Sequence, residues 1–487
     1  MNETNHDKKY DQKHDKTLST EQKALSINLD NNQYGTFVEI GAGQEVARQF
    51  FSAGAAAGTV AKTMSAYDMQ VSDDIYGKAG RYVSRERLEQ MLSHEYELLH
   101  KRLGEVRPQE TQYFSYAATV TAKSYSQKNE CHGWIGIKFQ PEADAEASEI
   151  IMHVRMLDDT NREQSEALGI FGVNVVYGAF HYKDQPKVFI ESLLDNLVDG
   201  FGQKRIEVDL IHFSGSQFKT IENRLMNLHL VRSWCCRAVM FDAEGQSEVP
   251  GSLLRKKDVM VIRGSFKPPT KVHLDMTEAA MQQFLKEDGI NPEKVCTVAE
   301  ITMAELASDD DETDASFLAR VDLLNKLGYN VLISDYLRFF RLRSWMRRYT
   351  QNRIGIVLSI LDFDQLFNEE YYEGLEGGIL EAMGKLFSGN TNVYVYPTRV
   401  NGGLITLDNV KVSENTHYLL QHLKDNKLLV ATETWNDENL HISAHNIAKE
   451  IPLGQGDWEK QLPEAIRDEI KDKCMFGYCE LPELPSD

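Results

Sequence analysis

The chain has 487 residues, a formal net charge of −21, 42% hydrophobic residues and 26% charged residues. At about 100 to 200 residues per domain, this length excludes one small module and fits two or three domains. The apolar content is that of folded globular chains, which excludes disorder along the whole chain. Because the net negative charge repels nucleic acid and anionic lipid, we expect neither as a partner.

The start of the chain carries charges without an apolar run, and no later stretch reaches about 18 consecutive apolar residues. We therefore expect a soluble, cytoplasmic protein with no membrane partner. Six cysteines occur without a Cys-x-x-Cys spacing, which predicts reduced thiols, no disulfide framework and no metal site. Nothing in the sequence identifies a cofactor.

Residues 1–33 are rich in Asn, Asp, Lys and Gln, and we predict a disordered tail there. Beyond it, short apolar runs alternate with helical periodicity, which implies crossover connections. We predict an α/β fold with mainly parallel or mixed sheets flanked by helices, in two or three subdomains. The acidic stretch 307–314 separates an N-terminal α/β region, residues 34–306, from a C-terminal α/β domain, residues 315–487. A further boundary near residue 145 stays open.

The predicted elements alternate in type along both regions. In the first region, strands are expected at residues 36–40, 113–122, 133–140, 149–156, 205–213, 238–241 and 259–263, and helices at 44–51, 83–103, 162–180, 187–197 and 277–286. In the second region, helices at residues 316–327, 336–349 and 375–387 alternate with strands at 329–334, 353–360 and 392–396.

The first predicted strand ends in a glycine bend, Gly41-Ala42-Gly43, that leads directly into a helix. In such a bend, main-chain amides and the helix dipole can bind a phosphate, so Gly41 and Gly43 are candidate contacts for a small anionic ligand. The alternative is a bend that only joins strand to helix, since Val46 replaces the third glycine of the dinucleotide fingerprint. The segment VEIGAG also resembles the first motif of methyltransferases that use S-adenosylmethionine.

Polar residues near the end of the strand 149–156 are candidates for acid and base chemistry. His153 lies on this strand, and Asp158 and Asp159 follow it, where α/β sheets usually bind ligands. Carboxylates and an imidazole can exchange protons with a substrate, so these three are the predicted catalytic residues. The alternative for the loop is capping of the next helix by Asp159 or Thr160.

Two further histidine patterns carry less information. Asp209 and His212 lie three apart on the strand 205–213, so at most one of them faces a shared pocket if the strand is regular. His441 and His445 have the spacing of a helical zinc pair but lack the glutamate of the protease motif. We interpret the second pair as ordinary polar residues.

Two basic segments are unexpected in so acidic a chain. Arg338 and Arg341 belong to a group of six arginines within 16 residues, and Arg263 and Lys267 enclose a glycine after a predicted strand. We predict these four as contacts for a phosphate or carboxylate group. The alternatives are internal salt bridges, or an acidic surface on another copy of the chain, which would make the protein a noncatalytic homo-oligomer.

Several stretches together resemble a bacterial family of about this length, over nearly the whole folded region. They are FVEIGAGQEVARQFF, AGTVAKTMSAYDM, RYVSRERLEQML, HVRMLDDTNREQSEALGIFGVN, RYTQNRIGIVLSI and LEGGILEAMGKLF. Members of this family often carry the name nicotinate-nucleotide adenylyltransferase, which implies a nucleotide substrate.

Nucleotidylyltransferases of that class have His-x-Gly-His, or a variant with Thr, just after their first strand, where the imidazoles stabilise the phosphates under attack. The bend at residues 41–44 contains no histidine, and their second motif, Ile-Ser-Ser-Thr before a basic residue, is echoed by Ile333, Ser334 and Arg338. The residues favour an α/β enzyme acting on a nucleotide or another phosphorylated small molecule, with no reaction specified. The assembly protein, the adenylyltransferase and the methyltransferase are the alternatives.

Overall fold

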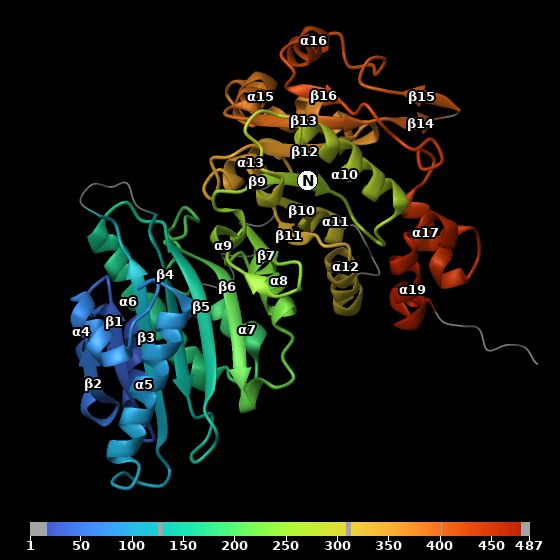
Figure 1. Cartoon of the computed structure of the whole chain (residues 1–487). Helices are drawn as coiled ribbons and strands as arrows, with labels where there is room; N and C mark the ends of the chain where they lie inside the picture. The colour runs from blue at the N-terminus through green and yellow to red at the C-terminus, as the bar shows by residue number, and fades with distance from the viewer. Residues whose placement is uncertain (1–16, 125–129, 308–312, 401, 479–487) are drawn as a thin grey trace, which may run out of the picture. The chain divides into compact units, whose positions relative to one another are not determined.

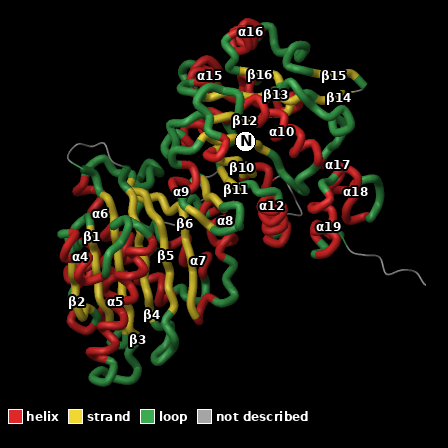
Figure 2. Tube along the Cα trace, viewed as in Figure 1, coloured by secondary structure: helices red, strands yellow, loops and turns green. Residues whose placement is uncertain are grey.

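The computed structural model describes residues 17–124, 130–307, 313–400 and 402–478. The chain divides into two compact units, Met1–Cys236 and Arg237–Asp487. Each unit has a large sheet flanked by helices, which confirms the predicted α/β class with parallel and mixed sheets (Figures 1 and 2). In the described ranges, no helix is both long and apolar enough to cross a bilayer.

The observed division differs from the predicted boundary at residues 307–314. The second unit already begins at Arg237, because the strand β7 (Ala238–Phe241) pairs with β11 (Asn330–Ser334) in its sheet. The acidic stretch therefore connects two elements of one unit instead of two domains. Residues 308–312 of that stretch lie outside the described residues.

The first unit contains a six-stranded sheet with the order β2-β1-β3-β4-β5-β6. β1 is parallel to β2 and β3, and the other neighbours are antiparallel. The strands are β1 (Gln33–Ile40), β2 (Val60–Met64), β3 (Gln112–Thr121), β4 (His132–Phe139), β5 (Ser148–Met156) and β6 (Ile206–Gly215). The helices are α2 (Thr20–Leu29), α3 (Glu45–Ala53), α4 (Met69–Tyr76), α5 (Arg85–Leu103), α6 (Asn161–His181), α7 (Pro186–Ser192) and α8 (Asn223–Arg232).

Helix α2 lies within the segment predicted to be a disordered tail. Its first turn is capped by Ser19, which forms a capping box with Gln22. The helix packs on α3 and α6 through buried residues that include Lys23 and Ile27. The predicted tail over residues 1–33 is therefore wrong from residue 20 onward, because a few well-placed residues anchor a helix that composition alone does not reveal. Its first 16 residues lie outside the described part of the chain.

The second unit contains an eight-stranded sheet with the order β16-β13-β12-β9-β10-β11-β7-β8. Neighbours from β16 to β11 are parallel, and β7 and β8 extend one edge in antiparallel pairing. The remaining strands are β8 (Ser247–Glu248), β9 (Asp258–Arg263), β10 (Val295–Thr302), β12 (Ile354–Ser359), β13 (Thr391–Tyr396) and β16 (Leu429–Ala431), with β14 (Thr398–Val400) and β15 (Gly403–Ile405) as a separate pair. The longer helices are α10 (Lys271–Phe284), α12 (Asp314–Lys326), α13 (Phe339–Met346), α15 (Gly378–Phe387), α16 (His417–Asp425), α17 (Ala444–Glu450) and α19 (Glu464–Asp472).

The order of the parallel strands indicates where this unit can bind a ligand. β9 is the first parallel strand along the chain and lies in the middle of the sheet, with β10 and β11 on one side and β12, β13 and β16 on the other (Figure 1). This is the doubly wound order 3-2-1-4-5-6, whose direction reverses between β9 and β12. A crevice beyond the carboxyl ends of these two strands is the usual ligand position in such sheets.

Candidate functional sites

The bend between β1 and α3, the predicted anion site, is filled by a carboxylate of the chain itself. Glu39 accepts hydrogen bonds from the main-chain amides of Val46 and Ala47, each at 3.0 Å. Burial raises the pKa of Glu39 to about 7, although the two amides act in the opposite direction. Because these two amides at the helix N-terminus already have an acceptor, they are not open donors for an external phosphate.

The two glycines of this bend allow backbone conformations that other residues rarely adopt. Gly41 has a φ of 110°, and a Cβ there would lie 1.9 Å from the carbonyl oxygen of Val120. Gly43 has a φ of 81°, and its amide donates to the hydroxyl of Tyr67 at 3.1 Å. The cavity lined by Glu39 and Gly43 has a volume of about 10 Å³, which is room for about one water molecule. These contacts fit a bend that joins strand to helix, and this cavity is far too small for S-adenosylmethionine.

The two predicted catalytic aspartates do not face a shared site. Asp158 forms an ion pair with Arg205 at 2.8 Å, and Arg205 also donates to the carbonyl oxygen of Glu163 at 2.7 Å. Asp159 is exposed to solvent. Thr160 caps α6 and forms a capping box with Glu163. Helix capping, the second interpretation of this loop, is therefore the observed one.

His153, the third predicted catalytic residue, belongs to a hydrogen-bonded chain across three adjacent strands. Its Nδ1 lies 2.5 Å from Oδ1 of Asp209 on β6, and its Nε2 lies 3.0 Å from Nδ1 of His132 on β4. A β-bulge in the pairing of β5 with β6 follows His153 and turns Asp209 toward its imidazole. The sequence analysis missed His132, because its position beside His153 depends on strand register.

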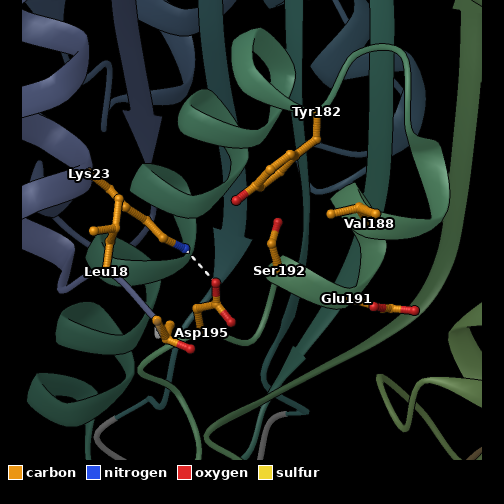
Figure 3. Close-up of a pocket in the computed structure, with 8 residues that line it drawn as sticks. Leu18, Lys23, Tyr182, Val188, Glu191, Ser192 and Asp195 are labelled. Atoms are coloured by element: carbon orange, nitrogen blue, oxygen red, sulfur yellow. Dashed lines mark hydrogen bonds and ion pairs between the residues drawn. The ribbon is translucent and has the colours of Figure 1, made fainter. Parts of the chain in front are cut away.

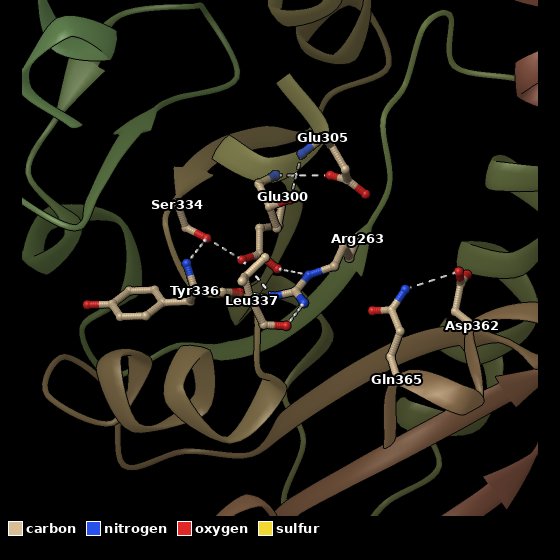
Figure 4. Close-up of polar contacts among 9 residues, drawn as sticks. Arg263, Glu300, Glu305, Ser334, Tyr336, Leu337, Asp362 and Gln365 are labelled. Atoms are coloured by element: carbon tan, nitrogen blue, oxygen red, sulfur yellow. Dashed lines mark hydrogen bonds and ion pairs between the residues drawn. The ribbon is translucent and has the colours of Figure 1, made fainter. Parts of the chain in front are cut away.

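Arg263, at the carboxyl edge of the second unit's sheet, is held by groups of the chain itself (Figure 4). Its guanidinium donates to both carboxylate oxygens of Glu300, at 2.9 and 3.1 Å, and to the carbonyl oxygens of Tyr336 and Leu337. Glu300 is fully buried and also accepts from the hydroxyl of Ser334 at 2.5 Å. Because its donors are directed at these acceptors, Arg263 joins the ends of β9, β10 and β11 and is poorly placed as a ligand contact.

The loop that follows β9 leads into α10 through a close pair of polar residues. Arg320 on α12 donates to the carbonyl oxygen of Ser265 at 3.2 Å, which supports the loop. The amide of Thr270 donates to Nδ1 of His273 at 3.0 Å, so the ring proton of His273 lies on Nε2. Burial lowers the pKa of His273 to about 4, which keeps the imidazole neutral at pH 7.

Two more residues of this loop shape the surroundings of His273. A Cβ at Gly264 would lie 3.5 Å from Nε2 of His273, so the glycine keeps a side chain away from that N–H group. Lys267 adds a cation that is partly buried. Near Arg263, burial raises the pKa of Asp362, which accepts from Gln365 at 3.3 Å (Figure 4). The sequence analysis missed Thr270 and His273, and a Thr-x-x-His spacing behind a strand was the available signal.

The arginines around α13 do not form one continuous basic surface. Arg338 donates to the carbonyl oxygen of Tyr371 at 2.9 Å and stacks on its ring at 4.3 Å. Arg341 is exposed. By contrast, Arg343 and Arg347 donate to main-chain carbonyls just before β13. Arg338 and Arg341 stay predicted ligand contacts. Their positions do not test the alternative prediction that the protein is a homo-oligomer.

A larger cavity, of about 210 Å³, lies in the first unit (Figure 3). Tyr182, Ser192 and Asp195 line it together with Lys23. The ammonium group of Lys23 donates to Asp195 at 2.7 Å and to Asn174 at 2.9 Å, so its charge is balanced within the protein. None of the predicted site residues lines this cavity.

Comparisons with known proteins add little about function. No family model and no curated protein matches the sequence. Similar solved structures include the competence/damage inducible protein CihA from Agrobacterium tumefaciens, with 17% identity, 32% of this chain and 93% of that chain covered, and a TM-score of 0.24. The CinA superfamily proteins from Enterobacter cloacae and Escherichia coli have 11% and 12% identity, cover 34% and 33% of this chain and 93% and 91% of theirs, and have TM-scores of 0.25. At these TM-scores the similarity carries no argument about activity.

Among the described residues, no group of three or more His, Cys, Asp or Glu side chains could hold a metal ion.

Proposed function

We propose that the second unit binds a nucleotide at the carboxyl edge of its parallel sheet and acts as an adenylyltransferase for a pyridine mononucleotide. The observation that carries this proposal is Thr270-Lys271-Val272-His273, which follows the loop behind the first and central strand, β9. This segment resembles the Thr variant of the nucleotidylyltransferase motif His-x-Gly-His, with Val272 in place of the glycine. The bend at residues 41–44, which follows the first strand of the chain, belongs to the other unit.

The chemistry of His273 suits a phosphate ligand. Its neutral imidazole offers Nε2–H as a hydrogen-bond donor next to Gly264. The N-terminus of α10, a helix of 14 residues, favours negative charge in the same region, and Lys267 adds a cation. In adenylyl transfer, a phosphate oxygen of the mononucleotide attacks the α-phosphorus of ATP and pyrophosphate leaves. Donors that are already in position stabilise the charge that develops on the phosphoryl oxygens.

The residues Ile333 and Ser334, which resemble the second motif of the nucleotidylyltransferases, have a structural role in this protein. Ser334 donates its hydroxyl to the buried carboxylate of Glu300, so the Ile333-Ser334 pair belongs to the scaffold. Another Ile-Ser pair, at residues 442 and 443, stands directly before α17, where Ser443 caps the helix by accepting from the amide of Asn446. We assign to the proposed site only the loop behind β9 and the start of α10.

Titration calorimetry with ATP and nicotinic acid mononucleotide, followed by an assay for dinucleotide and pyrophosphate, tests the proposal. His273→Ala should weaken ATP binding at least about tenfold, because a hydrogen bond to a charged group is worth about 1.5 to 3 kcal/mol. His422→Ala, which removes an exposed histidine on α16, should bind like the unmodified protein. Absence of ATP binding by the folded protein, or unchanged binding by folded His273→Ala, would contradict the proposal.

A further inference from the structure

Two arginines that form no ion pair lie at the amino edge of the second unit's sheet. Arg343 and Arg347 donate to main-chain carbonyls and to the hydroxyl of Thr391, and neither is paired with a carboxylate in the described part of the chain. Burial lowers the pKa of Arg347 to about 10, and repulsion from Arg343 acts in the same direction. The two guanidinium groups therefore carry positive charge that their surroundings do not balance.

Three consecutive cations at residues 255–257 extend this group. They directly precede β9, and their side chains form no ion pair with any described residue. Asn352, whose carbonyl oxygen accepts from Arg347, donates to the carbonyl oxygen of Lys256 at 3.1 Å. The parallel strands β9, β12 and β13 begin at the same edge of the sheet (Figure 1). The cations at this edge form the basic surface: Arg255, Lys256, Lys257, Arg343 and Arg347.

The carboxylates on neighbouring elements do not neutralise the basic surface. Asp258, the first residue of β9, is buried and accepts from the amide of Arg353 at 3.0 Å. Glu287, which follows α10, pairs with the guanidinium of Arg353 at 3.5 Å. Both carboxylates are therefore directed at Arg353, just before β12.

The carboxyl edge of the same sheet carries a group of exposed carboxylates. They lie in the segment 364–376, between β12 and α15, and form no ion pair with the residues that the structure describes. Arg338, which follows β11, donates to the carbonyl oxygen of Tyr371 at 2.9 Å and so joins this segment to the carboxyl edge, where it offsets part of the charge. The carboxylates of this segment form the acidic surface: Asp364, Glu369, Glu370, Glu373 and Glu376.

We propose that the basic surface of one copy of the chain binds the acidic surface of a second copy. The strands between the two surfaces are about six residues long, which separates the surfaces by about 20 Å. Because charges are screened over about 8 Å at physiological ionic strength, the two surfaces of one copy do not neutralise each other. The same screening weakens the repulsion between two chains of net charge −21, whereas opposite charges in contact still attract.

The positions of the two surfaces determine how copies associate. Since they lie at opposite edges of one sheet, a copy that uses its basic surface keeps its acidic surface open for another copy. Such head-to-tail contacts do not stop at a dimer, and they give rings or filaments.

A second copy fits these surfaces better than another anion does. The overall charge of the chain repels nucleic acid, whereas each further copy brings the complementary carboxylates. Leu361 and Tyr371, which are exposed beside the acidic surface, add apolar area that a protein partner would cover. This association is independent of the proposed nucleotide site, because none of the ten charged residues belongs to the loop behind β9 or to the start of α10.

Sedimentation velocity of the full chain over a range of protein concentrations tests the association. In about 0.1 M NaCl the mass should rise with concentration, and in about 1 M NaCl the protein should be a monomer, because salt screens the contact. A monomer at every concentration in 0.1 M NaCl, or association that persists in 1 M NaCl, would overturn the proposal.

Two double charge reversals test which surfaces meet. Arg255→Glu with Lys256→Glu, and Glu369→Lys with Glu370→Lys, should each weaken self-association about tenfold or more, since like charges then face each other. An equal mixture of the two variants should associate again, because each retains the surface that the other has lost. This recovery also shows that both variants are folded. Self-association of either variant as strong as that of the unmodified protein would overturn the proposal.

The matched control changes the net charge elsewhere. Lys78→Glu with Lys219→Glu alters two exposed residues of the first unit by the same total charge as the first reversal, and it should associate like the unmodified protein. An equal loss in this control would assign the effect to net charge and overturn the proposal. Binding of a labelled single-stranded oligonucleotide that Arg255→Glu with Lys256→Glu abolishes, in a protein that stays a monomer, would assign the basic surface to nucleic acid instead.

Discussion

Two glycine-bearing bends, one in each unit, lead from a parallel strand into a helix. They differ in the groups that form hydrogen bonds at the start of that helix. Between β1 and α3, the short bend at residues 41–44 has its helix amides bound by Glu39. Between β9 and α10, the longer loop at residues 264–270 is supported from outside, by Arg320 and by the pair of Arg263 with Glu300. The first bend has an internal acceptor, and the second has a neutral imidazole donor at the start of its helix.

This difference teaches that a glycine bend predicts an anion site only when the acceptor of its amides is known. Glu39 stands two residues before Gly41, at the end of the strand, from where its carboxylate reaches back to the helix. A carboxylate at that position is itself a sequence signal for a bend that is filled by its own chain. No such acidic residue stands at Ile262 or Val261 before the second loop.

Removing the carboxylate that pairs with Arg263 at the second bend should have the largest effect on the free energy of unfolding. Glu300→Ala leaves the guanidinium of Arg263 buried without its carboxylate, which typically costs about 3 to 5 kcal/mol. Urea denaturation of the full chain measures the loss. The matched control is Glu433→Ala, which removes an exposed ion pair with Lys286 and should change stability little. Equal stabilities for the two variants would show that the loop does not depend on this pair.

The first bend should tolerate a side chain at one glycine much better than at the other. Gly41→Ala forces a Cβ against the carbonyl of Val120 at a φ that disfavours side chains, which should cost about 3 kcal/mol. Gly43→Ala also has a positive φ, but nothing lies within 4 Å of its Cβ position, so about 1 kcal/mol is expected. Thermal and urea denaturation of both variants give the comparison. A cost at Gly43 as large as that at Gly41 would contradict the close approach of β3 to the bend.

The acceptor of the first bend should make stability depend on pH. Burial raises the pKa of Glu39 from 4.5 to about 7, so the folded chain holds this proton more tightly than the unfolded chain. Stability contributed by the protonated form is present below about pH 4.5 and is lost as the pH rises through 7, by on the order of 3 kcal/mol. Glu39→Gln should lack this loss, and the difference between the two stability curves isolates it. Parallel curves between pH 4.5 and 7 would contradict the raised pKa.

The fold class could be read from the sequence because strands and helices alternate with clear periodicity in both units. The strand predicted at residues 259–263 corresponds to β9, and the helix predicted at 83–103 corresponds to α5. The division between the units could not be read, because it depends on β7 pairing with a strand that lies about 90 residues later in the chain. The acidic stretch at residues 307–314 was predicted to be a boundary from its composition, which contains no information about which strands pair.

The candidate sites were predictable only in part, for physical reasons that differ between residues. Arg263 and Lys267 marked the correct loop by their charge, but Arg263 turned out to bind Glu300, which comes from another strand. The hydrogen bond between His153 and Asp209 depends on a bulge that turns Asp209, and a bulge changes which face a side chain occupies without changing the composition. Register and bulges are properties of pairing, so a single sequence does not reveal them.

The smallest effect on stability should come from the loss of the Tyr67 hydroxyl, which accepts a hydrogen bond from the amide of Gly43. Tyr67→Phe removes the acceptor of the Gly43 amide, at a position where Tyr67 is 63% exposed, so water can replace the lost bond. We expect a loss of about 0.5 kcal/mol in urea denaturation. We also expect no gain in phosphate binding by calorimetry, because the amides of Val46 and Ala47 keep Glu39 as their acceptor. If Tyr67→Phe did bind phosphate, one free amide would be enough to make such a bend an anion site, and the contrast between the two bends would lie in their hydroxyl partners instead of their carboxylates.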